Sequence, residues 1–213
     1  LFRDEEFKFY ILFVSLATLV IAFVIFFISP QYGTVEKTFR DSLFHVTSII
    51  TTTGFSTTNY MTWPSLTWLI LILLMVTGAC SGSTTGGIKI ARVILLIKNS
   101  FYEFKRRLHP NAILPIRMNK EFVSEKVINS LFAFFTIYIT IIFVSTFILA
   151  LSGMSIVDSL SATVASISNI GTTLGNLGTG NFSAIPSFAK WYLSFLMLIG
   201  RLELFTVLLL LSP

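Results

Sequence analysis

The sequence predicts an all-α membrane protein built from two tandem repeats, each with a spanning helix, a short re-entrant helix and a second helix. Three observations predict this class: the composition, the length of the apolar runs and an internal repeat. Of 213 residues, 54% are hydrophobic and only 12% are charged, and the mean hydropathy is +0.83. A chain of this composition has too little polar surface for a soluble globule of its size. Its expected surroundings are therefore a lipid bilayer.

Three long apolar runs are predicted to be spanning helices. They cover residues 9–29, 127–151 and 191–211, and each exceeds the roughly 20 residues that an α-helix needs to cross about 30 Å of hydrocarbon. The first run is longer than the apolar part of a signal peptide and has no convincing small-residue cleavage site, so we interpret it as a span. A fourth run, residues 63–79, is too short to span in a simple way.

The distribution of positive charge predicts which segments face the cytoplasm. Lysines and arginines cluster between residues 89 and 126, whereas the segments on the other side carry only Lys37, Arg40 and Lys190. Because loops rich in Lys and Arg stay inside, the middle segment and the amino terminus are predicted to be cytoplasmic. The net charge of +5 follows from this bias and gives no support to a nucleic-acid partner.

The second half of the chain repeats the first. A shift of 117 residues places Asp41 on Asp158, Gly54 on Gly171 and Asn59 on Asn176 without a gap. We therefore expect two helix/re-entrant helix/helix units, residues 1–108 and 109–213. Repetition at a fixed shift organises the whole architecture.

The short helix of each unit is predicted to enter the membrane and return on the same side. Residues 41–50 would rise only about 15 Å, half the hydrocarbon thickness. Asp41 and Asp158 are the expected N-caps, near external water. The carboxyl end of the helix would then point at the bilayer centre, where its partial negative charge favours a cation.

An uncharged polar segment follows each short helix, residues 51–54 (TTTG) and 168–171 (SNIG). Non-helical backbone at membrane depth is tolerated where protein shields it or where it lines a watery cavity. Inward carbonyls can replace the water shell of a monovalent cation, and the lack of carboxylates argues against a divalent-cation ring. The alternative is a pair of polar external loops. The predicted ion-binding residues are Thr52, Thr53, Gly54, Asn169, Ile170 and Gly171, with the cation at Thr52, Thr53, Asn169 and Ile170.

These motifs, TTTGF in one unit and SNIGTTLG in the other, resemble the Trk/Ktr/HKT superfamily of potassium transporters over essentially the whole chain. The resemblance implies four repeats around one pore, of which this chain holds the third and fourth, so that the first and second are missing. It also implies potassium as the transported ion, no cofactor bound by this chain, a multi-pass protein of the bacterial inner (plasma) membrane, a homodimer and a cytoplasmic nucleotide-binding regulatory ring. The chain would be the carboxyl-terminal half of a longer protein or, alternatively, a half-size subunit.

A glycine-rich stretch interrupts the fourth apolar run and is the candidate gate. Glycines and hydroxyl residues disfavour regular helix here, and the resemblance implies a movable loop beneath the filter. The alternative is a simple bend. The stretch is not a phosphate-binding loop, because Ile88 and Lys89 stand where Lys and Ser/Thr would be needed. The gating candidates are Gly78, Gly82, Ser83, Thr84, Thr85, Gly86 and Gly87.

Arg201 is the second gating candidate, because it lies in the middle of the last apolar run, two residues before Glu203. A charge at that depth costs at least about 2.5 kcal/mol and usually faces a pore or a partner. The resemblance places it just below the filter, where it would hinder cations. The alternative is a structural ion pair.

The remaining segments leave two further points. Residues 88–108 are predicted to form a helix leaving the membrane, either as a docking surface for the regulatory ring or as an interfacial anchor, and residues 110–117 form a linker.

The leading function is potassium uptake, and the alternative is a sodium-permeable or ion-coupled (Na⁺ or H⁺) transporter. An intramembrane enzyme using His45 is not expected, because the sequence offers it no convincing base and orienting acid.

Overall fold

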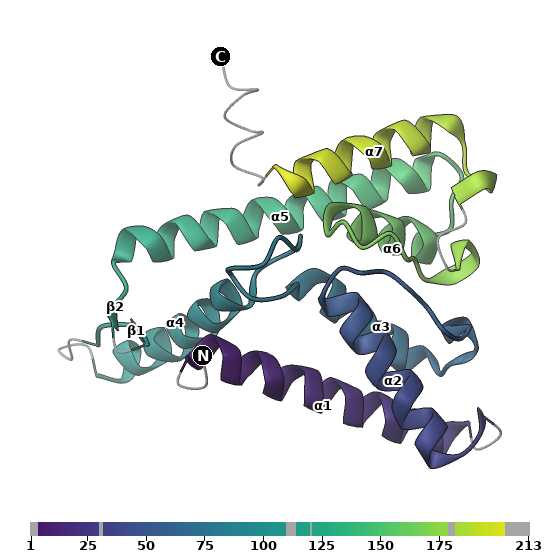
Figure 1. Cartoon of the computed structure of the whole chain (residues 1–213). Coiled ribbons are helices and arrows are strands. Elements are labelled where there is room, and N and C mark those ends of the chain that lie inside the picture. The colour runs from purple at the N-terminus through teal and green to yellow at the C-terminus, as the bar shows by residue number, and fades with distance from the viewer. Residues whose placement is uncertain (1–3, 30–31, 110–113, 120, 179–181, 203–213) are drawn as a thin grey trace.

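The computed structural model describes residues 4–29, 32–109, 114–119, 121–178 and 182–202. These form two units joined through a protruding helix (Figure 1). The helices are α1 (Glu5–Ile28), α2 (Val35–Ile50), α3 (Ser65–Thr77), α4 (Ile90–Leu108), α5 (Glu125–Leu151), α6 (Ile156–Ile167) and α7 (Ser187–Arg201). Short 3₁₀ turns occupy Tyr60–Thr62, Gly175–Leu177 and Phe182–Ala184, and a two-stranded hairpin comprises β1 (Arg117–Met118) and β2 (Glu121–Phe122).

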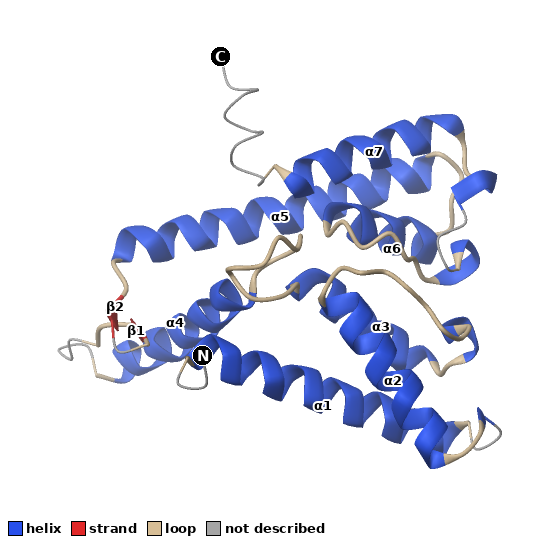
Figure 2. Ribbon diagram, in the orientation of Figure 1, coloured by secondary structure: helices blue, strands red, loops and turns tan. Residues whose placement is uncertain are grey.

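Each unit contains a long helix, a shorter helix and a third helix, as the internal repeat predicts. The first unit is α1 to α3 and the second is α5 to α7, and contacts between α3 and α6 bring them together. The loops that follow α2 and α3 lie between the two units (Figure 2). The main buried core includes Ile21, Leu71 and Leu196, each almost fully buried, so it draws on helices of both units.

The expected spanning segments are helical where the chain is described. α1 and α5 are both long and apolar enough to cross a membrane by length and composition. The described part of α7 ends at Arg201, so most of the second half of the predicted run 191–211 lies outside the described residues. The predicted linker 110–117 lies partly outside them as well.

The predicted N-caps of the short helices were wrong. Thr34 caps α2 and Ser155 caps α6, each with extended backbone and a side-chain oxygen that accepts a backbone N–H. Asp41 lies well inside α2. Asp158 stands three residues after its cap, where its carboxylate accepts from the Ser155 hydroxyl at 2.7 Å. α2 therefore has 16 residues, about 24 Å in length, and is longer than predicted.

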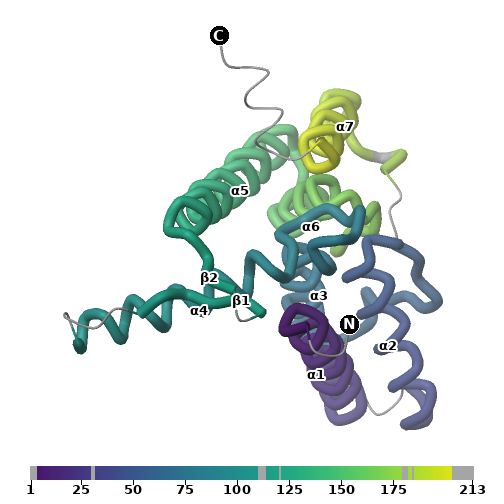
Figure 3. Tube along the Cα trace, turned by 60° about the vertical axis from the view of Figure 1, so that its left-hand side comes forward, coloured from purple at the N-terminus to yellow at the C-terminus, as the bar shows by residue number. Residues whose placement is uncertain are grey.

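Two features lie outside the paired units. α4 projects away from the rest of the helices (Figure 3), which agrees with the predicted helix at 88–108. The hairpin pairs Arg117 with Phe122 and Met118 with Glu121, and the sequence did not predict it.

Candidate functional site

The chain leaves α2 and α6 by the same hydrogen-bonded turn. The first polar segment (residues 51–54) and the second polar segment (residues 168–171) each fold back onto the last turn of the preceding helix. In the first unit, Thr53 N donates to Ser48 O at 2.8 Å and Thr52 N donates to Ile49 O at 3.0 Å. The equivalent bonds of the second unit are Ile170 N to Ala165 O at 2.9 Å and Asn169 N to Ser166 O at 3.0 Å. The repeat found in the sequence is therefore also a repeat of backbone geometry.

Both polar segments carry left-handed backbone at the same two positions. Thr52 has φ 53° and Asn169 has φ 57°, while Gly54 and Gly171 have φ 77° and 89°. Asparagine tolerates this region, but a β-branched threonine there is strained, and such strain costs about 1–3 kcal/mol. Strained backbone of this kind persists where its surroundings impose it, and it clusters at ligand sites.

The two segments lie against each other. A Cβ on Gly54 would stand 2.2 Å from the carbonyl oxygen of Ile170, whereas a Cβ on Gly171 would meet no heavy atom within 4 Å. Glycine at position 54 is therefore required by the close approach of two backbones as well as by its φ. The predicted ion-binding residues of the two units are thus brought together.

The surroundings of the two segments differ. Thr51 and Thr53 are exposed, whereas Ser168 and Ile170 are 0% and 6% exposed. The Asn169 Nδ2 atom is buried and has no hydrogen-bond partner among the described residues. The units share a backbone geometry but are unequally covered by the described part of the chain.

The glycine-rich stretch is an irregular loop, as predicted, and not a bend in a continuous helix. α3 ends at Thr77, Gly78 turns the chain with φ 63°, and α4 begins only at Ile90. We call residues 78–89 the α3–α4 loop. Its end returns to the last turn of α3, because Ile88 N donates to Val76 O at 2.8 Å.

The α3–α4 loop reaches the start of the second polar segment. A Cβ on Gly86 would lie 2.4 Å from Ser168 O, so only glycine allows this approach. The Ser168 hydroxyl is also 3.1 Å from the Tyr138 hydroxyl of α5. Ser83, Thr84 and the other predicted gating residues from 85 to 87 line a cavity of about 280 Å³ beside it.

Arg201 joins α7 to this loop. It is the last residue of α7 as described, and its Nη1 donates to Thr84 O at 2.7 Å. The side chain is exposed, and none of the ion pairs formed by described residues includes it. Glu203 lies outside the described residues. The two groups of predicted gating residues, those of the loop and Arg201, therefore meet through a hydrogen bond from the Arg201 guanidinium to a loop carbonyl.

Sequence reasoning missed several residues of this site. Lys89 and Arg92 line the same cavity, and the Arg92 guanidinium lies over the Phe134 ring at 4.2 Å. Their positions, at the end of the loop for Lys89 and in the first turn of α4 for Arg92, were a usable signal. The Tyr60 hydroxyl donates to Thr173 O at 2.7 Å across the two units, and no pattern in the sequence indicated this contact.

His45 has a packing role. Its Nδ1 lies 2.8 Å from Asp41 O, and its ring contacts the rings of Tyr60 and Trp63. Among the described residues, no group of His, Cys, Asp or Glu could hold a metal ion.

Comparisons with known proteins agree on one family. The family model TrkH, described as a cation transport protein, matches residues 1–213. The chain is 34% identical over 212 residues to the Trk system potassium uptake protein TrkH of Halomonas elongata, covering 100% of this chain and 43% of that protein. It is 33% identical over 214 residues to the Trk system potassium uptake protein TrkG of Escherichia coli, with the same two shares.

A solved structure has the same fold. The crystal structure of the potassium transporter TrkH from Vibrio parahaemolyticus superposes with a TM-score of 0.91 at 34% identity, covering 100% of this chain and 45% of that one. The chain thus spans less than half the length of the relatives that it matches.

Proposed function

Because the chain belongs to the TrkH family of cation transport proteins, we propose that it forms part of the pore of a potassium uptake system in the bacterial inner membrane. Its relatives are named as potassium uptake proteins. The family is one of transport proteins, and an enzymatic role finds no support in it. The proposal for the whole protein goes beyond this chain, which covers 43% of those relatives.

The two polar segments are proposed to be two quarters of the selectivity filter. In this proposal residues 1–108 and 109–213 are the third and fourth repeats of four, and the carbonyls of Thr52, Thr53, Asn169 and Ile170 face the ion. The observation that carries it is the shared left-handed geometry of both segments together with the approach of Gly54 to Ile170 O. Two unrelated polar loops would require neither the shared left-handed geometry nor the close approach of their backbones.

The α3–α4 loop and Arg201 are proposed to close the pathway below the filter. Gly86 abuts the carbonyl that opens the second polar segment, and Arg201 holds Thr84 O. A fixed positive charge at this place disfavours a passing cation. Lys89 and Arg92 of the same cavity add to that barrier.

The proposed partners are a second copy of the protein and a cytoplasmic nucleotide-binding ring. The shape of α4 supports a docking role, since it projects from the helices (Figure 3) and carries Lys105, Arg106 and Arg107 in its last turn. Loss of ring binding in the triple alanine variant of these residues, with membrane insertion intact, would separate docking from anchoring.

Gly54→Ala in the full-length protein tests the filter proposal. The added Cβ must displace Ile170 O, so rubidium uptake should fall by about tenfold or more, or the preference for rubidium over sodium should be lost. Gly153→Ala is the matched control, because Gly153 also has positive φ (92°) but a Cβ there would meet nothing within 4 Å. Normal rubidium uptake and selectivity in Gly54→Ala would contradict the filter assignment. The same sodium measurement on the unmodified protein tests the sodium-permeable alternative.

A further inference from the structure

Ser81 of the α3–α4 loop is held through all of its polar groups. Its hydroxyl donates to Glu6 Oε2 at 2.7 Å, and its backbone N–H donates to Glu6 Oε1. On the other side, Lys89 Nζ donates to Ser81 O at 3.0 Å. Ser81 itself is exposed, so these contacts fix a part of the loop that packing does not cover.

Glu6 is a buried carboxylate directed at this loop. Only 7% of the residue is exposed, and none of the ion pairs among the described residues involves it. Burial of an unpaired carboxylate is costly unless its oxygens accept hydrogen bonds. Here both oxygens accept from Ser81, and the first turn of α1 adds a favourable helix dipole. The site is therefore organised around one loop residue 75 positions away.

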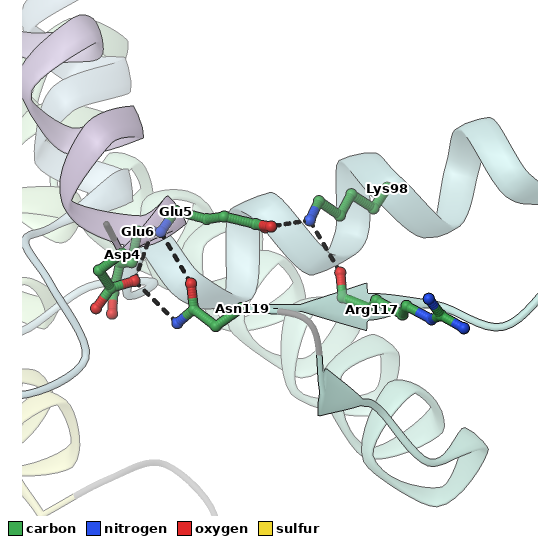
Figure 4. Close-up of polar contacts among 6 residues, drawn as sticks. All are labelled: Asp4, Glu5, Glu6, Lys98, Arg117 and Asn119. Carbon is green, nitrogen blue, oxygen red and sulfur yellow. Dashed lines mark hydrogen bonds and ion pairs between the residues drawn. The ribbon is translucent and has the colours of Figure 1, made fainter. Parts of the chain in front are cut away.

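The start of α1 is in turn fixed by the hairpin between the two units (Figure 4). Glu5 N donates to Asn119 Oδ1 at 2.9 Å, and Asn119 Nδ2 donates to Asp4 Oδ1 at 2.9 Å. The Glu5 carboxylate pairs with Lys98 of α4, which also donates to Arg117 O at 2.9 Å. Asn119 has φ 50°, a conformation that asparagine accepts more readily than most residues.

The charged form of Asp4 strengthens the contact between the hairpin and the start of α1. The Asn119 side chain and the backbone N–H of Glu6 donate to it and lower the pKa of its carboxyl. With a lowered pKa the contact is fully present above the ordinary pKa of aspartate and is lost as the pH falls through the lowered value. At neutral pH the hairpin and the first turn of α1 are therefore joined.

We infer that Glu6 is a positioning residue that holds the α3–α4 loop closed through Ser81, and that the hairpin at residues 117–122 sets the position of Glu6. This rests on the proposed gating role of the loop. It connects that loop to a segment on the proposed cytoplasmic side, through which a partner could release it. The route runs from Asn119 through the first turn of α1 to Glu6 and Ser81.

The test uses Glu6→Gln in the full-length protein, with Cys80 as the reporter and any cysteines outside this chain replaced. Cys80 is the neighbour of Ser81 and the one cysteine of the chain. Gln retains the size of Glu but loses one acceptor and the charge. Because Ser81 is exposed and water replaces part of the lost bonding, the rate of maleimide labelling should rise by about threefold or more.

Rubidium uptake per folded protein should rise in the same variant. A purely structural role would instead lower the yield of folded protein and leave the uptake per folded protein unchanged. Glu36→Gln is the matched control, since Glu36 pairs with Arg40 at the surface of α2 (73% and 66% exposed side chains) and should change neither readout. Unchanged labelling and uptake in Glu6→Gln overturns the inference.

Further variants keep the outcomes separate. If Glu6→Gln fails to fold, Ser81→Ala removes the hydroxyl from the same contact and should raise labelling and uptake in the same direction. Raised labelling with unchanged uptake supports the tether but overturns the gating role of the loop, which is the failure of the proposed function. If Asn119→Ala leaves Cys80 labelling unchanged while Glu6→Gln raises it, the part assigned to the hairpin is overturned.

Discussion

Removal of the Arg201 side chain tests the link between α7 and the α3–α4 loop. Arg201 Nη1 donates to Thr84 O at 2.7 Å, a length typical of a charged donor. Hydrogen bonds to charged groups contribute about 1.5–3 kcal/mol, and the exposure of Arg201 reduces this to about 0.7–1.5 kcal/mol. Because about 1.4 kcal/mol is a factor of ten in an equilibrium constant, Arg201→Ala should raise the open population of the loop roughly three- to tenfold.

The assay is rubidium uptake into proteoliposomes containing the full-length protein at a fixed driving force. Lys190→Ala is the matched control, because Lys190 lies near the other end of α7 and donates to Ser183 O at 3.0 Å, a bond of the same kind. Arg201→Lys keeps the charge without the planar guanidinium. If the positive charge forms the barrier, Arg201→Lys should keep the low uptake of the unmodified protein. If the guanidinium bond to Thr84 O forms the barrier, Arg201→Lys should show the raised uptake of Arg201→Ala. Unchanged or lower uptake in Arg201→Ala, with normal expression, would refute the reasoning.

Two further substitutions test close packing, the first within the second unit and the other between the two units. In Gly200→Ala the added Cβ would lie 1.9 Å from Ile167 O, so α7 must move away from α6 and stability should fall by about 3 kcal/mol or more; an unchanged thermal denaturation midpoint in detergent would show that this close approach is absent. Tyr60→Phe removes the donor to the buried carbonyl of Thr173 and should cost about 1–3 kcal/mol. For Tyr60→Phe, denaturant unfolding within experimental error of the unmodified protein would count against this contact as a tie between the units.

The sequence predicted the elements that depend on local composition. Apolar run length predicted α1 and α5, which are long and apolar enough to cross a membrane, since the bilayer thickness sets a minimum length. The cluster of glycines and hydroxyls predicted the break between α3 and α4, because such residues are poor helix formers. The shift of 117 residues anticipated the matching turns at Thr53 and Ile170.

The helix starts were mispredicted for a local reason. Asp, Ser and Thr all cap helices well, so residue type alone does not distinguish Thr34 from Asp41, or Ser155 from Asp158. In α2 the mostly polar residues 35–40 are already helical before Asp41, and in α6 the exposed apolar residues Ile156 and Val157 are helical before Asp158. Apolar patterning alone cannot place a cap when the first turn of a helix is exposed, whether its residues are polar or apolar.

The contacts around the loop could not be read from the sequence. Glu6 and Ser81 are 75 residues apart, and Arg201 and Thr84 are 117 apart. Neither pair follows from periodicity or from a motif, because each depends on how the loop packs against a helix far away in the sequence. The sequence marked Arg201 as a charge in an apolar run, but a partner carbonyl leaves no signature in side-chain identity.

The approach of Gly54 to Ile170 O has a consequence for biosynthesis. The two backbones that meet there are separated by just over half of the chain, and translation at about 5–20 residues per second needs roughly 6–23 s to pass from one to the other. During that interval the threonine-rich turn has been made but its neighbour has not. The N–H groups of Thr52 and Thr53 bond to the last turn of α2, so the turn forms from the first half alone, and the packing of Gly54 against Ile170 waits until the second half arrives.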